Sequence, residues 1–138
     1  MDRIEKSKEK FKQLFGEGVT TVDATEPDFQ DILSHFIFGE IFYQGNLDDK
    51  MRELITLVIL VTNQTLPQLK AHVHASLNIG LTPVEIKEAV YQCAPYIGFP
   101  KTLNALNEVN EVFKEKKKSL YRLKVKTLLM KIIVLTKD

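Results

Sequence analysis

Apolar side chains recur at helical spacing along most of the chain. The stretch 54–61 is apolar nearly all round, which predicts a central helix that starts near Asp48 and ends at residues 63–64. The connection Thr65-Leu66-Pro67-Gln68 has the form of a capping box with proline in the first turn. It predicts a second helix that ends at Gly80, and the two helices organise the rest of the fold.

Two more helices are predicted before this pair. Residues 3–15 place apolar side chains near one face, and Gly16 ends that helix. Thr25 is the expected N-cap of the next helix, whose apolar spacing continues up to Gly45. Gly39 inside it indicates either a close helix contact or a close ligand approach, and we favour the contact.

Two further helices are predicted after the pair. Thr82-Pro83-Val84-Glu85 is a second capping box, and Pro95 is expected to kink the helix that it opens. Gly98-Phe99-Pro100 breaks the chain before a last amphipathic helix that is expected to end at residues 115–118. No convincing alternating pattern precedes residue 119, so the sequence predicts an all-α domain of about six helices over residues 1–118.

The tail, residues 119–138, has a different composition, because it is basic and apolar throughout. Its apolar positions fit one helical face, although Ile132-Ile133-Val134 also suits a strand. Three interpretations compete: an extra helix that docks on a neighbouring subunit, a helix on a membrane surface, or a sequence change after the lysine run. We favour the first interpretation.

Composition restricts the class of protein. With 138 residues, 44% hydrophobic and 27% charged, the chain suits one domain. The net charge of +1 gives no reason to expect nucleic acid, and a charged N-terminus without any long apolar run predicts neither a signal peptide nor a membrane span. A single cysteine, Cys93, excludes an intrachain disulfide. We therefore expect a cytoplasmic protein without a cofactor.

The best chemical lead is an acid and a histidine on adjacent helices. Glu53 and His72 can face each other across the predicted helix pair, and a buried carboxylate favours an imidazole partner. The competing interpretations are a dipole contact for Glu53 and an interior histidine bound to a backbone carbonyl. His74 lies about 200° further round its helix, which predicts a surface or interface position. His35 is expected to be structural, and no metal site is predicted.

Other polar residues leave alternatives open. Arg52 is either a solvated charge or a group that neutralises Glu40 or an anionic substrate. Tyr96 belongs either to the core or to a pocket near the predicted kink. Cys93 is expected to be a buried, unreactive thiol.

The order and spacing of these residues resemble a known family. Glu53 and His72 match the Glu and His of a motif that places two cysteines between them in redox proteins, and this chain has Thr65 and Gln68 there. Further matches are Gly39-Glu40, Leu47-Asp48, Arg52-Glu53, Asn78-x-Gly80 and Tyr96-x-Gly98-x-Pro100. Residues 29–115 thus resemble the carboxymuconolactone decarboxylase family, whose relatives include the alkylhydroperoxidase D proteins.

The resemblance implies an all-α fold, a trimer or hexamer, and a cofactor-free lyase that decarboxylates a small lactone acid or a related carboxylate. Glu53 and His72 would be the catalytic pair that delivers a proton to carbon. The substrate would be bound by Glu40, Arg52, Lys70 and Tyr96. Two alternatives are a thiol-dependent peroxidase or disulfide reductase, which the missing cysteines disfavour, and a non-catalytic oligomeric protein that binds small molecules.

Overall fold

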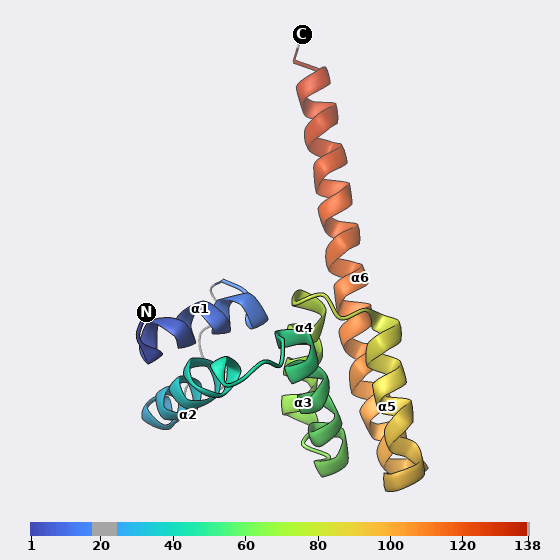
Figure 1. The fold of residues 1–138 in the computed structure, drawn as a ribbon. Coiled ribbons are helices and arrows are strands. Elements are labelled where there is room, and N and C mark those ends of the chain that lie inside the picture. Colours follow the sequence, from blue (N-terminus) through green and yellow to red (C-terminus); the bar gives the residue numbers. More distant parts are fainter. Residues whose placement is uncertain (18–24, 138) are drawn as a thin grey trace.

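The chain folds entirely as helices over the residues that the computed structural model describes, 1–17 and 25–137 (Figure 1). No strand occurs within these two ranges, which confirms the predicted all-α class. The elements are α1 (Arg3–Phe15), α2 (Pro27–Gly39), the 3₁₀ turn η1 (Ile41–Tyr43), α3 (Asp49–Asn63), α4 (Leu66–Asn78), α5 (Pro83–Ile97) and α6 (Phe99–Leu135).

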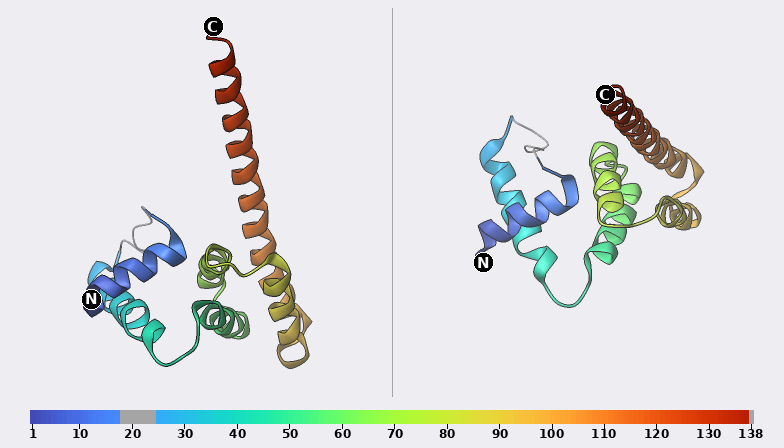
Figure 2. Two further views of the ribbon diagram at one scale, coloured as in Figure 1. Left: turned by 45° about the horizontal axis from the view of Figure 1, so that its top comes forward. Right: turned by 90° about the horizontal axis from the view of Figure 1, so that it is seen from above.

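The helices pack as three consecutive pairs, α1 with α2, α3 with α4, and α5 with α6 (Figure 2). Helix α4 joins the pairs because it also contacts α1 and α6, while α3 contacts α5. The α3–α4 pair therefore lies at the centre of the molecule, as the sequence predicts.

Two clusters of buried side chains hold the pairs together. The larger one lies between α3, α4, α5 and α6, and the smaller one lies between α1, α2, η1 and α4. The buried members of the larger cluster are Leu57, Val61, Leu69, Val73, Leu81, Ile86, Val90, Cys93, Ala105, Val109 and Val112. Those of the smaller cluster are Leu14, Phe38, Phe42 and Ala75.

Helix ends follow the predicted caps in most cases. The side chain of Asp48 accepts a hydrogen bond from the backbone N–H of Met51, and Thr82 forms its capping box with Glu85. The predicted box at Thr65 is wrong: Thr65 occupies the N-cap position, but its side chain makes no capping bond. Its hydroxyl instead lies 3.5 Å from the carbonyl oxygen of Leu60, at the end of the preceding helix.

The second helix is shorter at both ends than the sequence predicts. Its N-cap is Glu26 rather than Thr25, and Pro27 occupies the first helical position, where a missing N–H has no cost. The helix ends at Gly39, not at Gly45, and η1 follows. A Cβ on Gly39 would lie 2.4 Å from the carbonyl oxygen of Arg3, which confirms a close helix contact at this glycine.

Helix α3 is not buried all round. Its outer face exposes Ile55, Val58 and Ile59, because α4, α5 and α6 cover only the opposite side. The helix is central, as predicted, but this face of the single chain is not covered.

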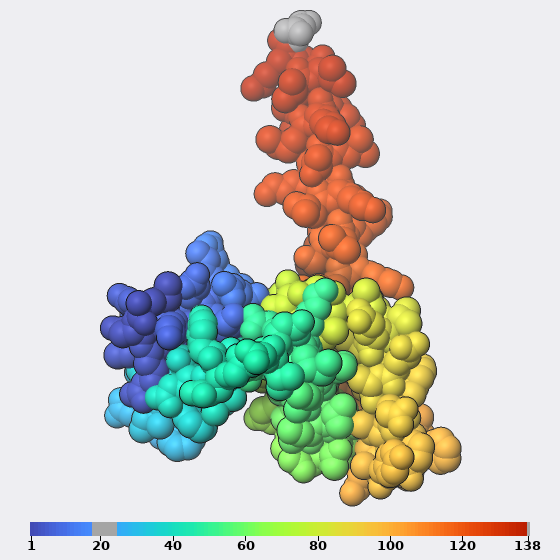
Figure 3. All heavy atoms as spheres, in the orientation of Figure 1, coloured from blue at the N-terminus to red at the C-terminus, as the bar shows by residue number. Residues whose placement is uncertain are grey.

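The last helix does not end at residues 115–118. Helix α6 continues without a break to Leu135, since no glycine or proline follows Pro100 to stop it. Its C-terminal part projects well beyond the other helices (Figure 3). Within the described residues, no helix combines the length and the apolarity needed to cross a membrane.

Candidate active site

Glu53 and His72 form a hydrogen-bonded pair between α3 and α4. The ring nitrogen Nδ1 of His72 lies 2.9 Å from Oε2 of Glu53. The Glu53 side chain has no exposed surface, whereas 18% of the His72 side chain is accessible. The second carboxylate oxygen, Oε1, is buried without a hydrogen-bond partner among the described residues. Among the described residues, the imidazole of His72 is therefore the one hydrogen-bond partner of the Glu53 carboxylate.

Helical periodicity explains why the acid is buried. Glu53, Leu57 and Val61 recur every four residues and all face the core from α3. On α4 the buried residues Leu69, Val73 and Ser76 face them. Glu53 therefore continues an apolar stripe, and a carboxylate in such a position needs a partner to offset the loss of hydration.

The imidazole reaches a cavity of about 380 Å³ enclosed by α1, α2, η1, α3 and α4. This volume lies in the range of small-molecule sites. The walls are mainly apolar and aromatic, and the polar residues among them are Gln30, Thr56, Gln68 and His72. The other lining residues are Phe11, Phe15, Leu33, Ile37, Phe38, Phe42, Leu60 and Ala71.

The hydrogen bond to Glu53 determines which nitrogen of His72 is available. An ionised carboxylate can only accept, so Nδ1 donates and Nε2 is left for other partners. No other described residue bonds to Nε2. The Phe15 ring stands edge-on to the imidazole, with centroids 5.5 Å apart. The alternative of an imidazole bound to a backbone carbonyl is therefore wrong for Nδ1, and His72 is held from two sides.

Gln68 is a site residue that the sequence reasoning treated only as a helix cap. The cap does not form, and Gln68 lines the same cavity as His72, one helical turn before it on α4. It stands at the position of the second cysteine of the redox motif, which was the signal that pointed to the site. No sequence motif indicates that Gln30 and Thr56 line the cavity, because their positions there depend on how α2 and α3 pack.

The structure does not bring the four predicted substrate-binding residues to this cavity. Arg52 donates to the backbone carbonyls of Ile41, Gln44 and Leu47. Its Nη1 lies 2.9 Å from the carbonyl oxygen of Ile41, and its Nε lies 3.0 Å from that of Leu47. Its guanidinium fastens η1 and the loop after it to α3. Glu40 is not its partner, because Glu40 pairs with Arg3 at 2.5 Å.

Lys70 and Tyr96 lie elsewhere. Lys70 pairs with Glu115 at 3.1 Å and with Glu111 at 3.5 Å, and the hydrogen bond to Glu115 raises the pKa of Lys70. Tyr96 is 82% exposed near the end of α5. Substrate binding by Glu40, Arg52, Lys70 and Tyr96 stays a prediction that the cavity of the single chain does not support.

The remaining histidines and the cysteine lie outside the site. His74 pairs with Glu115 at 3.1 Å on the side of α4 that faces α6, in line with its predicted surface position. His35 is half-buried on α2. Cys93 is buried in the larger cluster, where desolvation raises the pKa of its thiol.

Comparison with known proteins finds two similar decarboxylases. The chain is 34% identical over 88 residues to 4-carboxymuconolactone decarboxylase of Acinetobacter baylyi, covering 64% of this chain and 66% of that protein. It is 31% identical over 77 residues to nitrosuccinic acid decarboxylase of Metarhizium robertsii, covering 56% and 54%. It therefore spans less than two thirds of either relative. The model of the carboxymuconolactone decarboxylase family matches residues 27–111, which include both Glu53 and His72, and the chain belongs to that family.

Proposed function

We infer that the protein is a decarboxylase of a small organic carboxylate, with His72 as the proton donor and Glu53 as the residue that positions it. The observation that carries this inference is the Glu53–His72 pair at the wall of a mainly apolar cavity, in a chain whose two named relatives are decarboxylases. A lactone acid of the carboxymuconolactone type is the first substrate class, and a dicarboxylic acid such as nitrosuccinic acid is the second.

The reaction requires two chemical roles from the site: stabilisation of negative charge and donation of a proton. When the carbon–carbon bond to the carboxylate breaks, carbon dioxide leaves and the bonding electrons move towards the lactone carbonyl or another acceptor group of the substrate. Donors must stabilise the resulting charge, and an acid must then protonate carbon. The Nε2–H of a protonated His72 can give that proton, and the neutral ring regains a proton from water before the next turnover.

Glu53 supports this step through its position. Its carboxylate fixes the orientation of the ring and stabilises the positive charge that the donor carries. The buried side chain cannot itself reach substrate in the cavity, which separates its role from that of His72.

The amides of Gln30 and Gln68 and the hydroxyl of Thr56 can orient the substrate. They are the polar side chains other than His72 that line the cavity, and the two amides have N–H groups to donate. The Thr56 hydroxyl also bonds the carbonyl of Arg52 at 2.8 Å, so the two amides are the less committed donors. The mainly apolar walls lower the local polarity, which strengthens such contacts.

The protein is also proposed to be a homo-oligomer, a trimer or a hexamer. Support comes from the apolar face of α3, where Ile55, Val58 and Ile59 are exposed in the single chain. Exposed apolar residues that adjoin one another typically mark interaction surfaces.

A thiol-dependent peroxidase is disfavoured by chemistry. Such an enzyme needs an attacking and a resolving cysteine, and this chain has only Cys93, which is buried outside the cavity. A binding protein without turnover is the remaining alternative. Carbon dioxide release from 4-carboxymuconolactone and from nitrosuccinate tests the proposal, and a ligand-induced rise in melting temperature without any release would favour the binding protein.

A further inference from the structure

The last part of α6, residues 119–135 and here called the tail helix, projects into solvent (Figures 1 and 3). It is about 25 Å long at the rise of an α-helix. All of its large apolar side chains are exposed, and none belongs to either buried cluster. Ile132, Ile133 and Val134 have only modest helix propensity, so an uncovered helix of this sequence would be marginal in water. A partner surface is needed to stabilise it.

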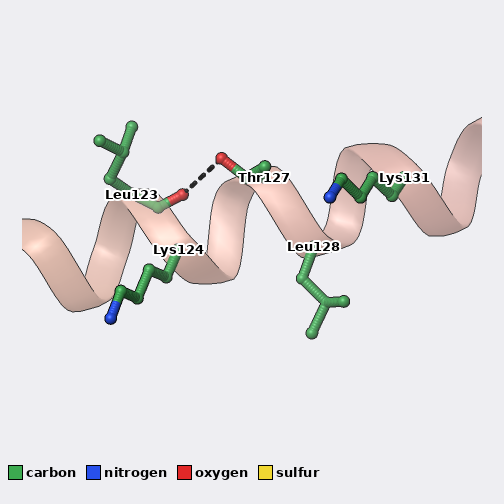
Figure 4. A pocket seen from close by; sticks show the side chains of 5 residues that line it. All are labelled: Leu123, Lys124, Thr127, Leu128 and Lys131. Carbon is green, nitrogen blue, oxygen red and sulfur yellow. Dashed lines mark hydrogen bonds between the residues drawn. The ribbon is translucent and has the colours of Figure 1, made fainter.

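The tail helix carries apolar residues on two sides. One strip has alternate spacings of four and three residues, and the second strip lies on the other side of the helix. Figure 4 shows Leu123 of the second strip and Leu128 of the first projecting in opposite directions. The first strip is Tyr121, Val125, Leu128, Ile132 and Leu135, and the second is Leu120, Leu123, Met130 and Val134.

Positive charge borders the two strips. Lys124 and Lys131 lie between them on one side, and on the other side Arg122 and Lys126 lie beside two further exposed apolar residues, Leu129 and Ile133. A helix that rests on a membrane surface has one apolar face and one strongly polar face. Two apolar strips fit contact with protein on more than one side better than contact with a lipid surface.

Charge is distributed unevenly between the tail and the rest of the chain. Residues 116–137 contain eight Lys or Arg and no Asp or Glu. Residues 1–115 contain eleven Lys or Arg and seventeen Asp or Glu, a net charge of −6. Two tail helices side by side would therefore repel each other, whereas a tail and the domain of another copy attract.

Helix α2 offers a matching surface. Its outer face exposes Phe29 (64%), Ile32 (64%) and Phe36 (53%) at helical spacing. Asp28 and Asp31 are exposed beside this strip. Helix α2 packs against α1 and η1, and no other described element covers its outer face. Within α3 itself, no exposed acidic residue lies beside the strip of Ile55, Val58 and Ile59.

The tail helix cannot reach α2 of its own chain. Helix α6 is continuous from Phe99 to Leu135, and its end projects far above α1 and α2 (Figure 1). A fold-back would require a break in a helix that has no glycine or proline after Pro100. The partner must therefore be a second molecule.

We propose that the tail helix is an intersubunit arm that packs an apolar strip against Phe29, Ile32 and Phe36 of a second copy, with Lys124 and Lys131 beside Asp28 and Asp31. The arm lies outside residues 27–111, which the family model matches. The proposal does not depend on the chemistry assigned to Glu53 and His72.

The test measures the molar mass of the full chain by light scattering at micromolar concentration and physiological salt. Charge reversal of the arm (Lys124→Glu with Lys131→Glu) or of α2 (Asp28→Lys with Asp31→Lys) is expected to lower the mass at least twofold. Combining all four substitutions should restore it, because the opposite charges meet again. A control pair on other exposed lysines, Lys8→Glu with Lys101→Glu, should leave the mass unchanged.

Several results would overturn the proposal. A monomeric wild-type protein, or a mass that neither reversal changes, would remove the intersubunit contact. Failure of the four-fold variant to recover mass, with normal helicity by circular dichroism, would exclude α2 as the docking face. Flotation with phosphatidylserine-containing vesicles that the arm reversal abolishes, at unchanged mass, would assign the tail helix to an anionic membrane instead.

Discussion

Glu53 and His72 share one hydrogen bond of 2.9 Å but differ completely in their access to solvent. The carboxylate is fully buried between α3 and α4, while the imidazole opens on the cavity. This asymmetry separates the two roles. Glu53 orients the imidazole ring and stabilises its positive charge, and of the two residues only His72 can contact a substrate.

Replacement of Gly39 by alanine is expected to destabilise the pairing of α1 with α2. The new methyl group would lie 2.4 Å from a backbone oxygen of Arg3, so α1 must shift. Overpacking of this kind typically costs about 1–3 kcal/mol. Urea unfolding measures the loss, and Ser34→Ala on the same helix serves as the control. A stability equal to that of wild type would show that α1 does not sit so close to α2.

Arg52→Ala distinguishes a structural guanidinium from one that binds substrate. The structure predicts a lower unfolding free energy, by about 1–3 kcal/mol, because three backbone carbonyls lose a charged donor. Arg52→Lys should recover only part of the lost unfolding free energy, since an ammonium group cannot reproduce the forked hydrogen bonding of a guanidinium. Thermal unfolding and KM are measured together. A raised KM at unchanged melting temperature would instead support the sequence-based prediction of substrate binding.

Sequence periodicity predicted much of the fold, including the α1 boundaries, the Asp48 cap and the Thr82–Glu85 box. It failed where one sequence pattern is compatible with two structural roles. The Thr65–Gln68 pattern looked like a cap, but Gln68 faces the cavity instead. The apolar run of α3 predicted a central helix but did not reveal the exposed face, since a helix that is apolar nearly all round can also contact a second chain.

The candidate site was predictable only in part. The Glu53–His72 spacing identified the pair, because the two residues lie on helices joined by a short turn. Phe11, Phe15 and Gln30 reach the cavity through the packing of α1 and α2, which no local pattern encodes. The sequence leaves Arg52 open between a solvated charge and a group that neutralises Glu40 or an anionic substrate, whereas its partners in the structure are backbone carbonyls that only the folded loop presents.

Gln68→Ala should raise KM more than it lowers kcat, if the amide orients the substrate without taking part in proton transfer. Loss of one hydrogen bond to a charged group corresponds to about 1.5–3 kcal/mol, or roughly a tenfold or larger change in KM. Gln92→Ala, on the exposed side of α5, is the matched control. An unchanged KM in the Gln68 variant would remove this residue from the site.

Cys93 should react slowly with iodoacetamide in the folded protein. Burial raises the pKa of the thiol, so less thiolate is present at any given pH, and the sulfur is also shielded. Mass spectrometry should show fast labelling only in denaturant. Cys93→Ser should leave turnover unchanged, and the wild type should not sustain hydroperoxide consumption, because no second cysteine resolves a sulfenic acid. Peroxidase turnover lost in Cys93→Ser would contradict this prediction.

The most direct test of the central claim compares carbon dioxide release from 4-carboxymuconolactone by wild type, His72→Ala, Glu53→Gln and His74→Ala. His74 is the matched control, since it lies on the same helix and also pairs with a glutamate, Glu115. The account predicts a loss of about 10²–10⁴-fold in kcat for His72→Ala, a smaller loss for Glu53→Gln, and normal turnover for His74→Ala. Full activity in a folded His72→Ala variant would contradict it.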